Sequence, residues 1–291
     1  MLSFKRLMSG LLVVACIVAS LAIAGCGVGQ AGGGAPLTVK VLDVGQGDAI
    51  FIRTPEQTVL IDTGDIPARD KLLAHLRNQG ISALDKVIIT HPHADHLGGM
   101  PGLLETFTVK QIFDSGQTTT SGLYRQYLGA VQKKNIPFKV VTAGELIDLG
   151  GGVTLKVLAP GKPFITGSDS DLNNNSIVTQ LVFGGFSMLL AADAEQPAED
   201  RMLKKYSSGL NSTILKSGHH GSRTSSSMPF LRAVNPEVAI ISAGVNNEYH
   251  HPHPATLKKY ADRKIKVYRT DTDGTVTITS DGKSYQISKE K

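Results

Sequence analysis

The sequence predicts a layered α/β fold for residues 37–291. Short runs rich in β-branched residues alternate along the chain with stretches of helical apolar spacing, and glycine, proline or asparagine separates most of them. A chain of 291 residues with 41% hydrophobic and 19% charged residues can also bury a sizeable core. Because sheets and helices must cover each other's apolar faces, we expect mixed layers of strands and helices.

The first half of this body is predicted to begin with three strands and a helix. The runs LTVKVLDVG, DAIFIRT and QTVLIDTG are typical of strands separated by turn residues. The helix follows over residues 67–80, since Pro67 suits its first turn, Gly80 suits its end, and leucines at helical spacing form an apolar stripe between them. Further elements follow in order: a buried strand at 85–90, a short helix at 98–107, a strand at 109–113 and a helix at 121–134.

The second half repeats this alternation. A polar loop is expected at 161–175, and a hairpin turning at Gly184 and Gly185 is expected within 176–194. The other predicted strands lie at 138–141, 146–150, 153–160, 212–218, 237–244 and 266–270, and at the chain end within 275–289. The other predicted helices lie at 194–206, 226–234 and 254–262. The run RTDTDG, residues 269–274, is expected to cap a strand or hairpin.

The first 36 residues are predicted to be a lipoprotein signal and tether. Lys5 and Arg6 precede an uncharged apolar run, which is typical of a signal peptide, with a buried or membrane-spanning helix as the alternative. The sequence IAGC resembles the lipobox of bacterial lipoproteins and predicts lipidation of Cys26, whereas Cys16 has too short an apolar run before it. The signal peptide would cover residues 1–25 and a Gly-rich tether residues 26–36, so we expect an extracytoplasmic protein anchored to the bacterial cell membrane.

The cysteine content limits the possible metal ligands, and the net charge limits the possible binding partners. With Cys16 removed and Cys26 lipidated, the folded body has no thiol, so any metal must be bound by histidine and carboxylate. The net charge of +5 becomes +3 without Lys5 and Arg6, because residues 1–25 contain no acidic residue. That is a mild bias toward anionic partners and does not by itself indicate nucleic acid.

Histidines are concentrated in three short stretches, THPHADHLGG, KSGHHGS and YHHPHP, which hold all of the nine except His75. The first stretch follows a predicted strand. Alternate residues of an extended segment point to the same side, so His91 and His93 can bind one ion, while Asp95 and His96 lie beyond the turn and face a neighbouring site. Neutral imidazole and carboxylate are the ligands expected for zinc or manganese. The pattern predicts a metal centre.

The motif HPHADH matches the HxHxDH motif of the metallo-β-lactamase superfamily, and VLIDTG, LLAADA and KSGHHGS resemble its other motifs. The ordered set LDVGQGDA, LIDTG, THPHADHLGG, NNNS, LLAAD, LKSGHHGS and HPHP also resembles the extracellular domain of the ComEC competence-channel family. The resemblance covers residues 38–281 but lacks the membrane channel of that family. It implies an αββα sandwich of two mixed sheets flanked by helices, with two divalent metal ions, zinc or manganese.

The resemblance also implies a ligand set. The first metal would be bound by His91, His93 and a bridging Asp193, and the second by Asp95, His96, Asp193 and His219, with His220 as the competing choice for the last ligand. Asp62 would orient a ligand histidine without contacting the metal, and Asp48 would lie near the metals.

One departure concerns the first metal. Many members of the superfamily have a further histidine ligand there, but no histidine lies between His96 and Asp193 in this chain. The first metal could therefore bind more weakly, be completed by water, or bind only together with substrate.

Two metals about 3.5–4 Å apart would activate a water to attack phosphorus or a carbonyl carbon. The candidates for catalysis are Asp95, Lys216, His220 and His253, and those for substrate binding are Asn175, Ser176, Ser222 and His251. Some of them have a simpler interpretation: Lys216 as an ordinary strand-end lysine, NNNS as a turn, and HHPHP as a solvent-facing helix start.

The predicted function is a metal-dependent phosphodiesterase, most simply a nuclease acting on DNA or another anionic phosphodiester polymer. A hydrolase of a β-lactam or lactone and a phosphodiesterase for teichoic-acid-type envelope polymers are the alternatives. A lipoprotein binding module with structural metals is a fourth interpretation. It is disfavoured because structural zinc sites are usually closed by four ligands.

Overall fold

The computed structural model describes residues 36–291. The predicted signal peptide, Cys26 and all of the tether but its last residue lie outside the described residues. Within the described part, no helix is long and apolar enough to cross a membrane.

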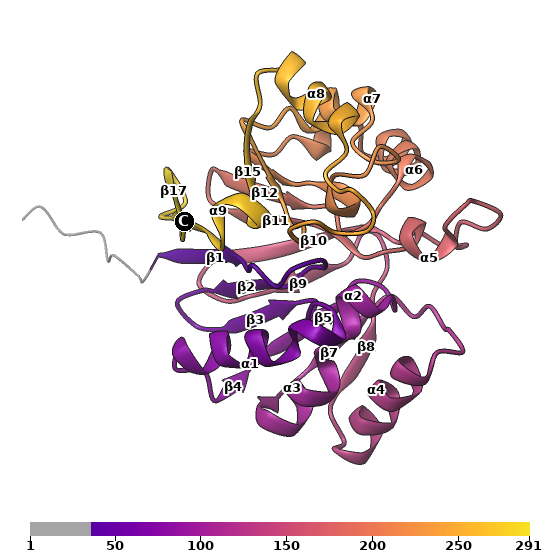
Figure 1. Ribbon diagram of the computed structural model, residues 1–291, viewed down its shortest axis with the longest axis vertical. Helices are drawn as coiled ribbons and strands as arrows, with labels where there is room; N and C mark the ends of the chain where they lie inside the picture. The colour runs from indigo at the N-terminus through magenta and orange to yellow at the C-terminus, as the bar shows by residue number, and fades with distance from the viewer. Residues whose placement is uncertain (1–35) are drawn as a thin grey trace, which may run out of the picture. The chain divides into compact units, whose positions relative to one another are not determined.

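Two mixed sheets form the centre of this part (Figure 1). The first has eight strands in the order β17-β16-β1-β2-β3-β5-β7-β8, with bounds β1 Leu37–Val41, β2 Ile50–Arg53, β3 Thr58–Ile61, β5 Lys86–Ile89, β7 Ile112–Asp114, β8 Phe138–Val140, β16 Val276–Ser280 and β17 Tyr285–Lys289. The second has seven in the order β15-β14-β13-β12-β11-β10-β9, with bounds β9 Leu146–Asp148, β10 Val153–Ala159, β11 Val178–Phe183, β12 Phe186–Leu190, β13 Ile214–Lys216, β14 Val238–Ile241 and β15 Lys266–Arg269.

Helices cover the outer face of each sheet. The first sheet is covered by α1 (Arg69–Asn78), α3 (Met100–Thr106) and α4 (Gly122–Lys133), and the second by α6 (Gln196–Tyr206), α7 (Met228–Val234) and α8 (Pro254–Asp262). The remaining short elements are η1 (Ile66–Ala68), β4 (Ala83–Leu84), α2 (Ala94–Leu97), β6 (Thr108–Val109), α5 (Asp171–Asn174), η2 (Ser207–Leu210), η3 (Gly218–Gly221) and α9 (Thr270–Asp273). The predicted αββα sandwich is confirmed.

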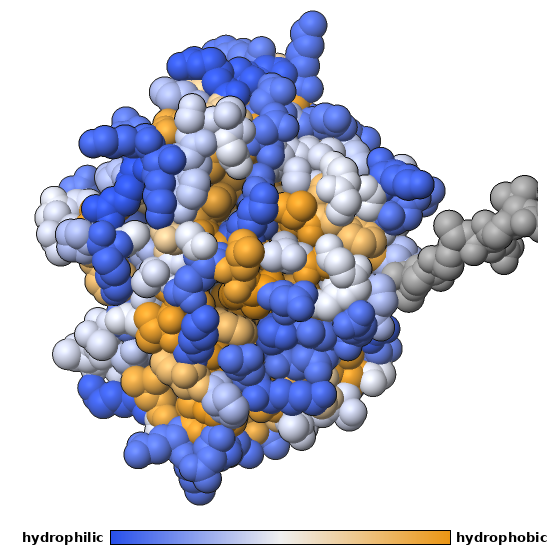
Figure 2. All heavy atoms as spheres, turned by 180° about the vertical axis from the view of Figure 1, so that it is seen from behind, coloured by the Kyte–Doolittle hydropathy of each residue, from blue (hydrophilic) through white to orange (hydrophobic). Residues whose placement is uncertain are grey.

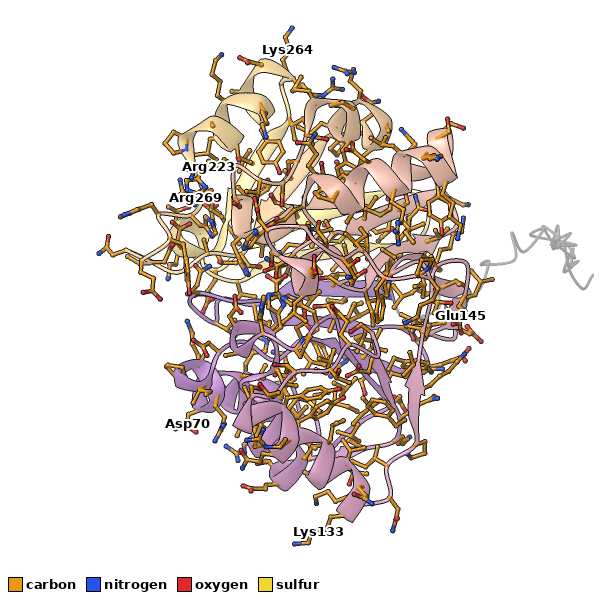
Figure 3. All side chains as sticks on the ribbon, turned by 90° about the vertical axis from the view of Figure 1, so that its right-hand side faces the viewer. Asp70, Lys133, Glu145, Arg223, Lys264 and Arg269 are labelled. Carbon is orange, nitrogen blue, oxygen red and sulfur yellow. The ribbon has the colours of Figure 1, made fainter. Side chains whose placement is uncertain are left out.

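Burial follows the pattern that predicted these strands. In β1 the side chains alternate between buried and half-buried, and those of Val39 and Val41 join a core that lies between the two sheets. Separate cores lie under the two helical layers. Charged side chains on those layers, such as Asp70, Lys133 and Lys264, point outward (Figure 3). The face seen in Figure 2 is mixed, with apolar residues exposed among charged ones.

Strand direction determines where the functional loops meet. Strands β3, β5, β7 and β8 pair in parallel in the first sheet, and β12 to β15 pair in parallel in the second. Parallel strands end at the same edge of a sheet, which is where ligand-binding residues gather in α/β proteins. The backbone N–H of Ile177 donates to Thr90 O at 2.9 Å, which joins the two sheets at this edge.

Two short helices differ from the sequence expectations. The expected polar loop at 161–175 contains α5, which begins at Asp171, and the Asp171 carboxylate accepts hydrogen bonds from the backbone N–H groups of Gly167 and Ser168. The RTDTDG segment forms α9. Helices of one turn have no apolar periodicity to reveal them, so sequence patterns rarely identify them.

A buried carboxylate links the second sheet's helices and leads to a pH prediction. Glu199 on α6 accepts hydrogen bonds from the backbone N–H groups of Ser226 and Ser227, at 2.6 and 2.9 Å, just before α7. Burial raises its pKa to about 7, against the lowering effect of those hydrogen bonds. A raised carboxyl pKa contributes stability that is complete below the unfolded value and is lost as the pH rises through about 7.

We therefore expect the melting temperature of the wild type to fall between about pH 4.5 and 7 relative to that of Glu199→Gln. Thermal unfolding of both proteins across this range checks the result. Parallel pH profiles of the two proteins would contradict it.

Candidate metal centre

The loop after β5 brings the first two histidines together. Strand β5 ends at Ile89, and the side chain of His91 is fully buried while that of His93 is half-buried. His91 Nε2 and His93 Nδ1 are 3.0 Å apart, so both rings are directed to one point, as the extended spacing predicted.

Helix α2 then presents Asp95 and His96. Close packing beneath it requires glycine: a Cβ on Gly98 would lie 2.3 Å from Ile66 N, and one on Gly47 would lie 2.3 Å from Asp95 O. The N–H of Asp48 donates to Asp95 O at 3.1 Å, so the DVGQGD segment supports the backbone of α2. That close contact explains the second glycine of this motif, Gly47.

Asp62 fixes the orientation of His96. It lies after β3 with a left-handed backbone, φ 58°, and accepts hydrogen bonds from the backbone N–H and hydroxyl of Thr90 at 2.8 and 2.7 Å. His96 Nδ1 is 2.8 Å from Asp62 Oδ2, so the Nδ1–H is donated to the carboxylate. Nε2 of His96 is then left with its lone pair facing the cluster, the tautomer that a metal ligand needs.

Asp193 and the two histidines of KSGHHGS arrive from the second sheet. Asp193 follows β12, and its Oδ2 is 3.3 Å from His96 Nε2. His219 and His220 lie in η3 after β13, both in left-handed conformations at φ 45° and 53°. Non-glycine residues with positive φ are strained, and such strain is concentrated at functional sites.

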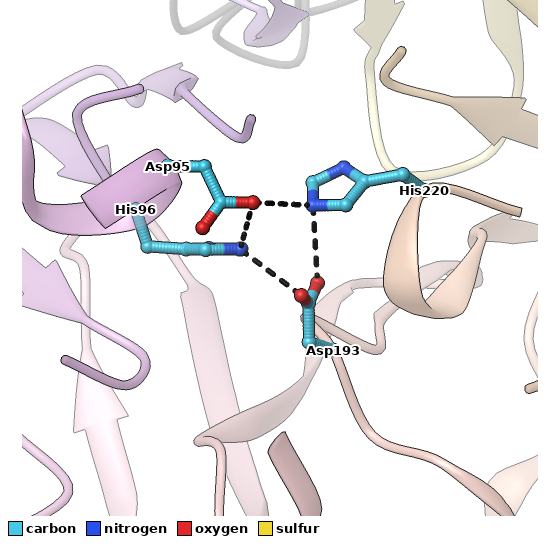
Figure 4. Close-up of side chains that lie close together, drawn as sticks. All are labelled: Asp95, His96, Asp193 and His220. Carbon is cyan, nitrogen blue, oxygen red and sulfur yellow. Dashed lines mark hydrogen bonds and ion pairs between the residues drawn. The ribbon is translucent and has the colours of Figure 1, made fainter. Parts of the chain in front are cut away.

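Four donors form the centre of the cluster (Figure 4). His220 Nε2 lies 3.2 Å from Asp95 Oδ2 and 3.5 Å from Asp193 Oδ1, while its Nδ1 donates to Ser242 O at 3.1 Å. One donor atom each from Asp95, His96, Asp193 and His220 lies within 4.8 Å of the others. His220 completes this group, so the structure favours the competing choice over His219 for the second metal.

The electrostatics of the cluster fit a cation. Burial lowers the pKa of His220, but the carboxylates of Asp193, Asp95 and Asp48 outweigh it and raise that pKa to about 10. The pKa of His96 is likewise raised well above its usual value, since Asp193, Asp95 and Asp62 outweigh burial.

Converging carboxylates thus require positive charge at this point. Nε2 of His96 and Oδ1 of Asp193 are buried without a hydrogen-bond partner. Buried polar atoms are rarely left unpaired. A set of histidine nitrogens and carboxylate oxygens with unpaired donors fits divalent metal ions.

A cavity of about 530 Å³ opens onto the cluster. Its walls include five residues that the sequence predicted as metal ligands or as the alternative ligand: His93, Asp95, Asp193, His219 and His220. They also include residues that the sequence had not singled out for a role there: Asp65, Asn173, Asn247, Glu248 and Tyr249. His251 also lines it, as predicted for a substrate-binding residue. Among the described residues, no lysine or arginine lines this cavity.

Lys216 lies elsewhere than predicted. Its side chain is fully buried, and Nζ donates to Asp48 Oδ2 at 2.8 Å and to Ser217 O at 3.2 Å. It is therefore a partner of Asp48 and is not available to bind a substrate phosphate. Asp48 also lies close to His220, on the Nδ1 side of its ring, with Oδ1 3.6 Å from Nδ1.

Two predicted substrate-binding residues, Asn175 and Ser176, do not line the cavity. The Asn175 amide holds the preceding loop, donating to Ile165 O and Asp171 O and accepting from Ile165 N. Ser176 is buried and does not line the cavity. The NNNS segment contributes Asn173 instead, because the turn of α5 directs that side chain inward.

Ser222 and His253 make local contacts outside the cavity lining. The Ser222 hydroxyl pairs with that of Thr224 at 2.9 Å, and His253 Nδ1 accepts from the N–H of Arg223 at 3.0 Å. The catalytic role predicted for His253 therefore has no geometric support here. The periodicity of the sequence could not separate these residues from His251, because all belong to polar loops.

Comparisons with known proteins agree with this fold. The model of the metallo-β-lactamase superfamily matches residues 42–245. ComE operon protein 3 of Bacillus subtilis is 33% identical over 256 residues, which cover 82% of this chain and 32% of that protein. Competence protein ComA of Neisseria gonorrhoeae is 32% identical over 241 residues, covering 81% and 31%. The chain thus spans about a third of the length of these relatives.

Among solved structures, the metallo-β-lactamase fold protein YhfI of Bacillus subtilis superposes with a TM-score of 0.54 at 14% identity, covering 80% of this chain and 95% of that one. At this identity the likeness concerns the fold alone. The match of the family model to residues 42–245 shows that the chain belongs to the metallo-β-lactamase superfamily.

Proposed function

We propose that this protein is a metal-dependent phosphodiesterase that acts on DNA or a related anionic polymer. The observation that carries the proposal is the opening of the four-donor cluster directly into the cavity. A structural metal would be enclosed by its ligands. The similarity to proteins named for competence supports a nucleic-acid substrate.

Different residues would bind the metal, orient its ligands and bind the substrate. Asp95, His96, Asp193 and His220 would hold one divalent ion, zinc or manganese, and His91 and His93 would hold the other together with Asp193. Asp62 would keep the His96 ring in place. When bound, two such ions supply an activated water and stabilise charge on the leaving oxygen. The neutral amides of Asn173 and Asn247 at the cavity wall can donate hydrogen bonds to anionic oxygens.

His251 suits a binding role better than proton donation. Burial lowers its pKa, and the neighbouring His220 and His219 lower it further, to about 3. Its imidazole is therefore neutral at pH 7 and can donate one hydrogen bond to a phosphate oxygen. Its ring stacks against that of Tyr249, with centroids 5.7 Å apart, at the exposed side of the cavity.

The site of action is part of the same proposal. The apolar N-terminal run and the IAGC sequence support export and lipidation at Cys26, which would place the enzyme outside the cytoplasmic membrane with the lipid bilayer as its partner. An anionic polymer at the cell surface would then be within its reach.

Hydrolysis assays with the purified full chain in detergent test the reaction. We expect cleavage of plasmid DNA and of bis(p-nitrophenyl) phosphate with added manganese or zinc, and its loss with chelator or in His91→Ala. Cleavage of a chromogenic cephalosporin without diester cleavage would contradict the proposal in favour of a carbonyl hydrolase. Diester cleavage that spares DNA would instead indicate an envelope phosphodiester.

Salt dependence gives a second readout on the same protein. Binding of a nucleic acid through its phosphates weakens steeply as salt increases. Since the described cavity wall has no lysine or arginine, that dependence would come from cations outside the cavity.

A further inference from the structure

His219 occupies the side of Asp193 that faces the first histidine pair. His219 Nε2 lies 3.8 Å from Asp193 Oδ2, and His91 Nε2 lies 3.8 Å from the same oxygen. Its neighbour His220 faces the other oxygen, Oδ1, at 3.5 Å. The two consecutive left-handed residues therefore bring one imidazole to each oxygen of Asp193.

The contacts of the His219 ring leave a lone pair on Nε2 that can coordinate a metal ion. His219 Nδ1 lies 2.9 Å from Glu195 Oε1 and 3.4 Å from the Thr224 hydroxyl. Because a carboxylate oxygen can only accept a hydrogen bond, the ring proton is assigned to the nitrogen that faces it, Nδ1. A carboxylate also lies beside Nδ1 of His96, where Asp62 Oδ2 is hydrogen-bonded at 2.8 Å. Metal-ligating histidines almost always donate their other ring N–H to a carboxylate, a carbonyl or water.

Two electron-rich atoms then face each other across a gap. In this tautomer neither His219 Nε2 nor Asp193 Oδ2 carries a hydrogen, and at 3.8 Å no hydrogen bond joins them. A cation between them would bind both lone pairs. The carboxylate is nearly fully buried, which makes an unscreened contact of this kind costly without such a cation.

Asn173 provides an independent indication at the same place. Its side chain is 4% exposed, its Nδ2 is 3.4 Å from His219 Nε2, and its Oδ1 is buried without a hydrogen-bond partner. The same Nδ2 is 3.4 Å from Glu195 Oε1, so the amide places its N–H groups beside two acceptors, which agrees with a lone pair on His219 Nε2. Asn173 also lines the cavity beside His93 and His219.

We propose that His219 completes the first metal position, together with His91, His93 and Asp193 Oδ2, and that Glu195 orients its ring. The position left open by the missing histidine between His96 and Asp193 would thus be filled from the KSGHHGS loop. The two adjacent histidines divide between the ions, His219 binding the first and His220 the second. This inference rests on the two-metal proposal above.

Metal titration tests it without relying on activity. Manganese is added to the full chain, and the free ion is counted from its electron paramagnetic resonance signal. We expect two bound ions in the wild type and one in His219→Ala, with the affinity of the affected position lowered by more than about 100-fold, beyond the loss typical of an outer partner. Glu195→Gln, which keeps the imidazole, should weaken the same position about 10–100-fold.

The controls separate this inference from the two-metal proposal. His75→Gln, on α1, should bind two ions, and circular dichroism should show each variant folded. Two ions of unchanged affinity in His219→Ala would overturn the inference alone. A single wild-type ion that persists in His219→Ala and disappears in His220→Ala would overturn both. A single ion lost in His219→Ala would retain His219 as a ligand and reject the two-metal reaction.

Discussion

Replacing Asp193 by asparagine is expected to lower diester hydrolysis by about 10³-fold or more. Asp193 Oδ2 is 3.3 Å from His96 Nε2, and Oδ1 is 3.5 Å from His220 Nε2, so this one carboxylate faces donors on both sides of the cluster. Asparagine keeps the size of the side chain but removes its charge. Metal ions contribute several kcal/mol of transition-state stabilisation, and each 1.36 kcal/mol is about tenfold in rate.

The measurement is kcat/KM for bis(p-nitrophenyl) phosphate with metal content determined on the same samples. Asp70→Asn is the matched control, because it makes the same change on an exposed side chain of α1 that points away from the molecule (Figure 3). We expect that control to keep the wild-type rate and metal content. Full activity in Asp193→Asn would exclude the proposed centre as the site of hydrolysis.

Replacing Lys216 by methionine is expected to reduce the free energy of unfolding by about 3–5 kcal/mol, the typical cost of removing one partner from a buried ion pair. Lys216 and Asp48 are both almost fully buried, with Nζ and Oδ2 2.8 Å apart. Burial raises the pKa of Asp48, but Lys216 and His220 outweigh it, so the pKa is lowered and the carboxylate is charged at neutral pH. Methionine would leave that charge without its partner.

Urea denaturation of the apoprotein, with metal chelated, measures the effect. The double variant Lys216→Met with Asp48→Asn should recover part of the lost stability, since it no longer buries an unpaired charge. Lys258→Met is the matched control: Lys258 pairs with Asp262 across an exposed turn of α8, where ion pairs contribute little. A Lys216→Met protein as stable as the wild type would show that the pair does not form in solution.

The contrast between these two residues shows where sequence reasoning succeeds. Asp193 was identified because LLAADA resembles a family motif, and such motifs are local in the chain. Lys216 was predicted to act in catalysis because it stands two residues before GHHGS. Its real partner, Asp48, lies 168 residues away, and no local pattern indicates that pairing.

The histidine pair after β13 shows the same limit. The backbone angles of neighbours in a loop decide where their side chains point, and His219 and His220 both adopt a left-handed conformation that is uncommon for residues other than glycine. The NNNS segment is similar, since one short turn of α5 turns Asn173 toward the cavity and Asn175 toward its own loop. Glu195 was missed because a lone acid before a helix carries no motif.

The sequence by itself determined the αββα class, the order of most strands and helices, the superfamily and the cluster of histidines after β5. These features follow from apolar periodicity and from motifs of adjacent residues, and both patterns involve residues that are close together in the sequence. Only the tertiary structure decided which histidine faces which oxygen of Asp193, that Lys216 is buried against Asp48, and that Asn173 lines the cavity. The physical reason is that hydrogen bonds and ion pairs act over about 3–4 Å between groups brought together only when the two sheets pack.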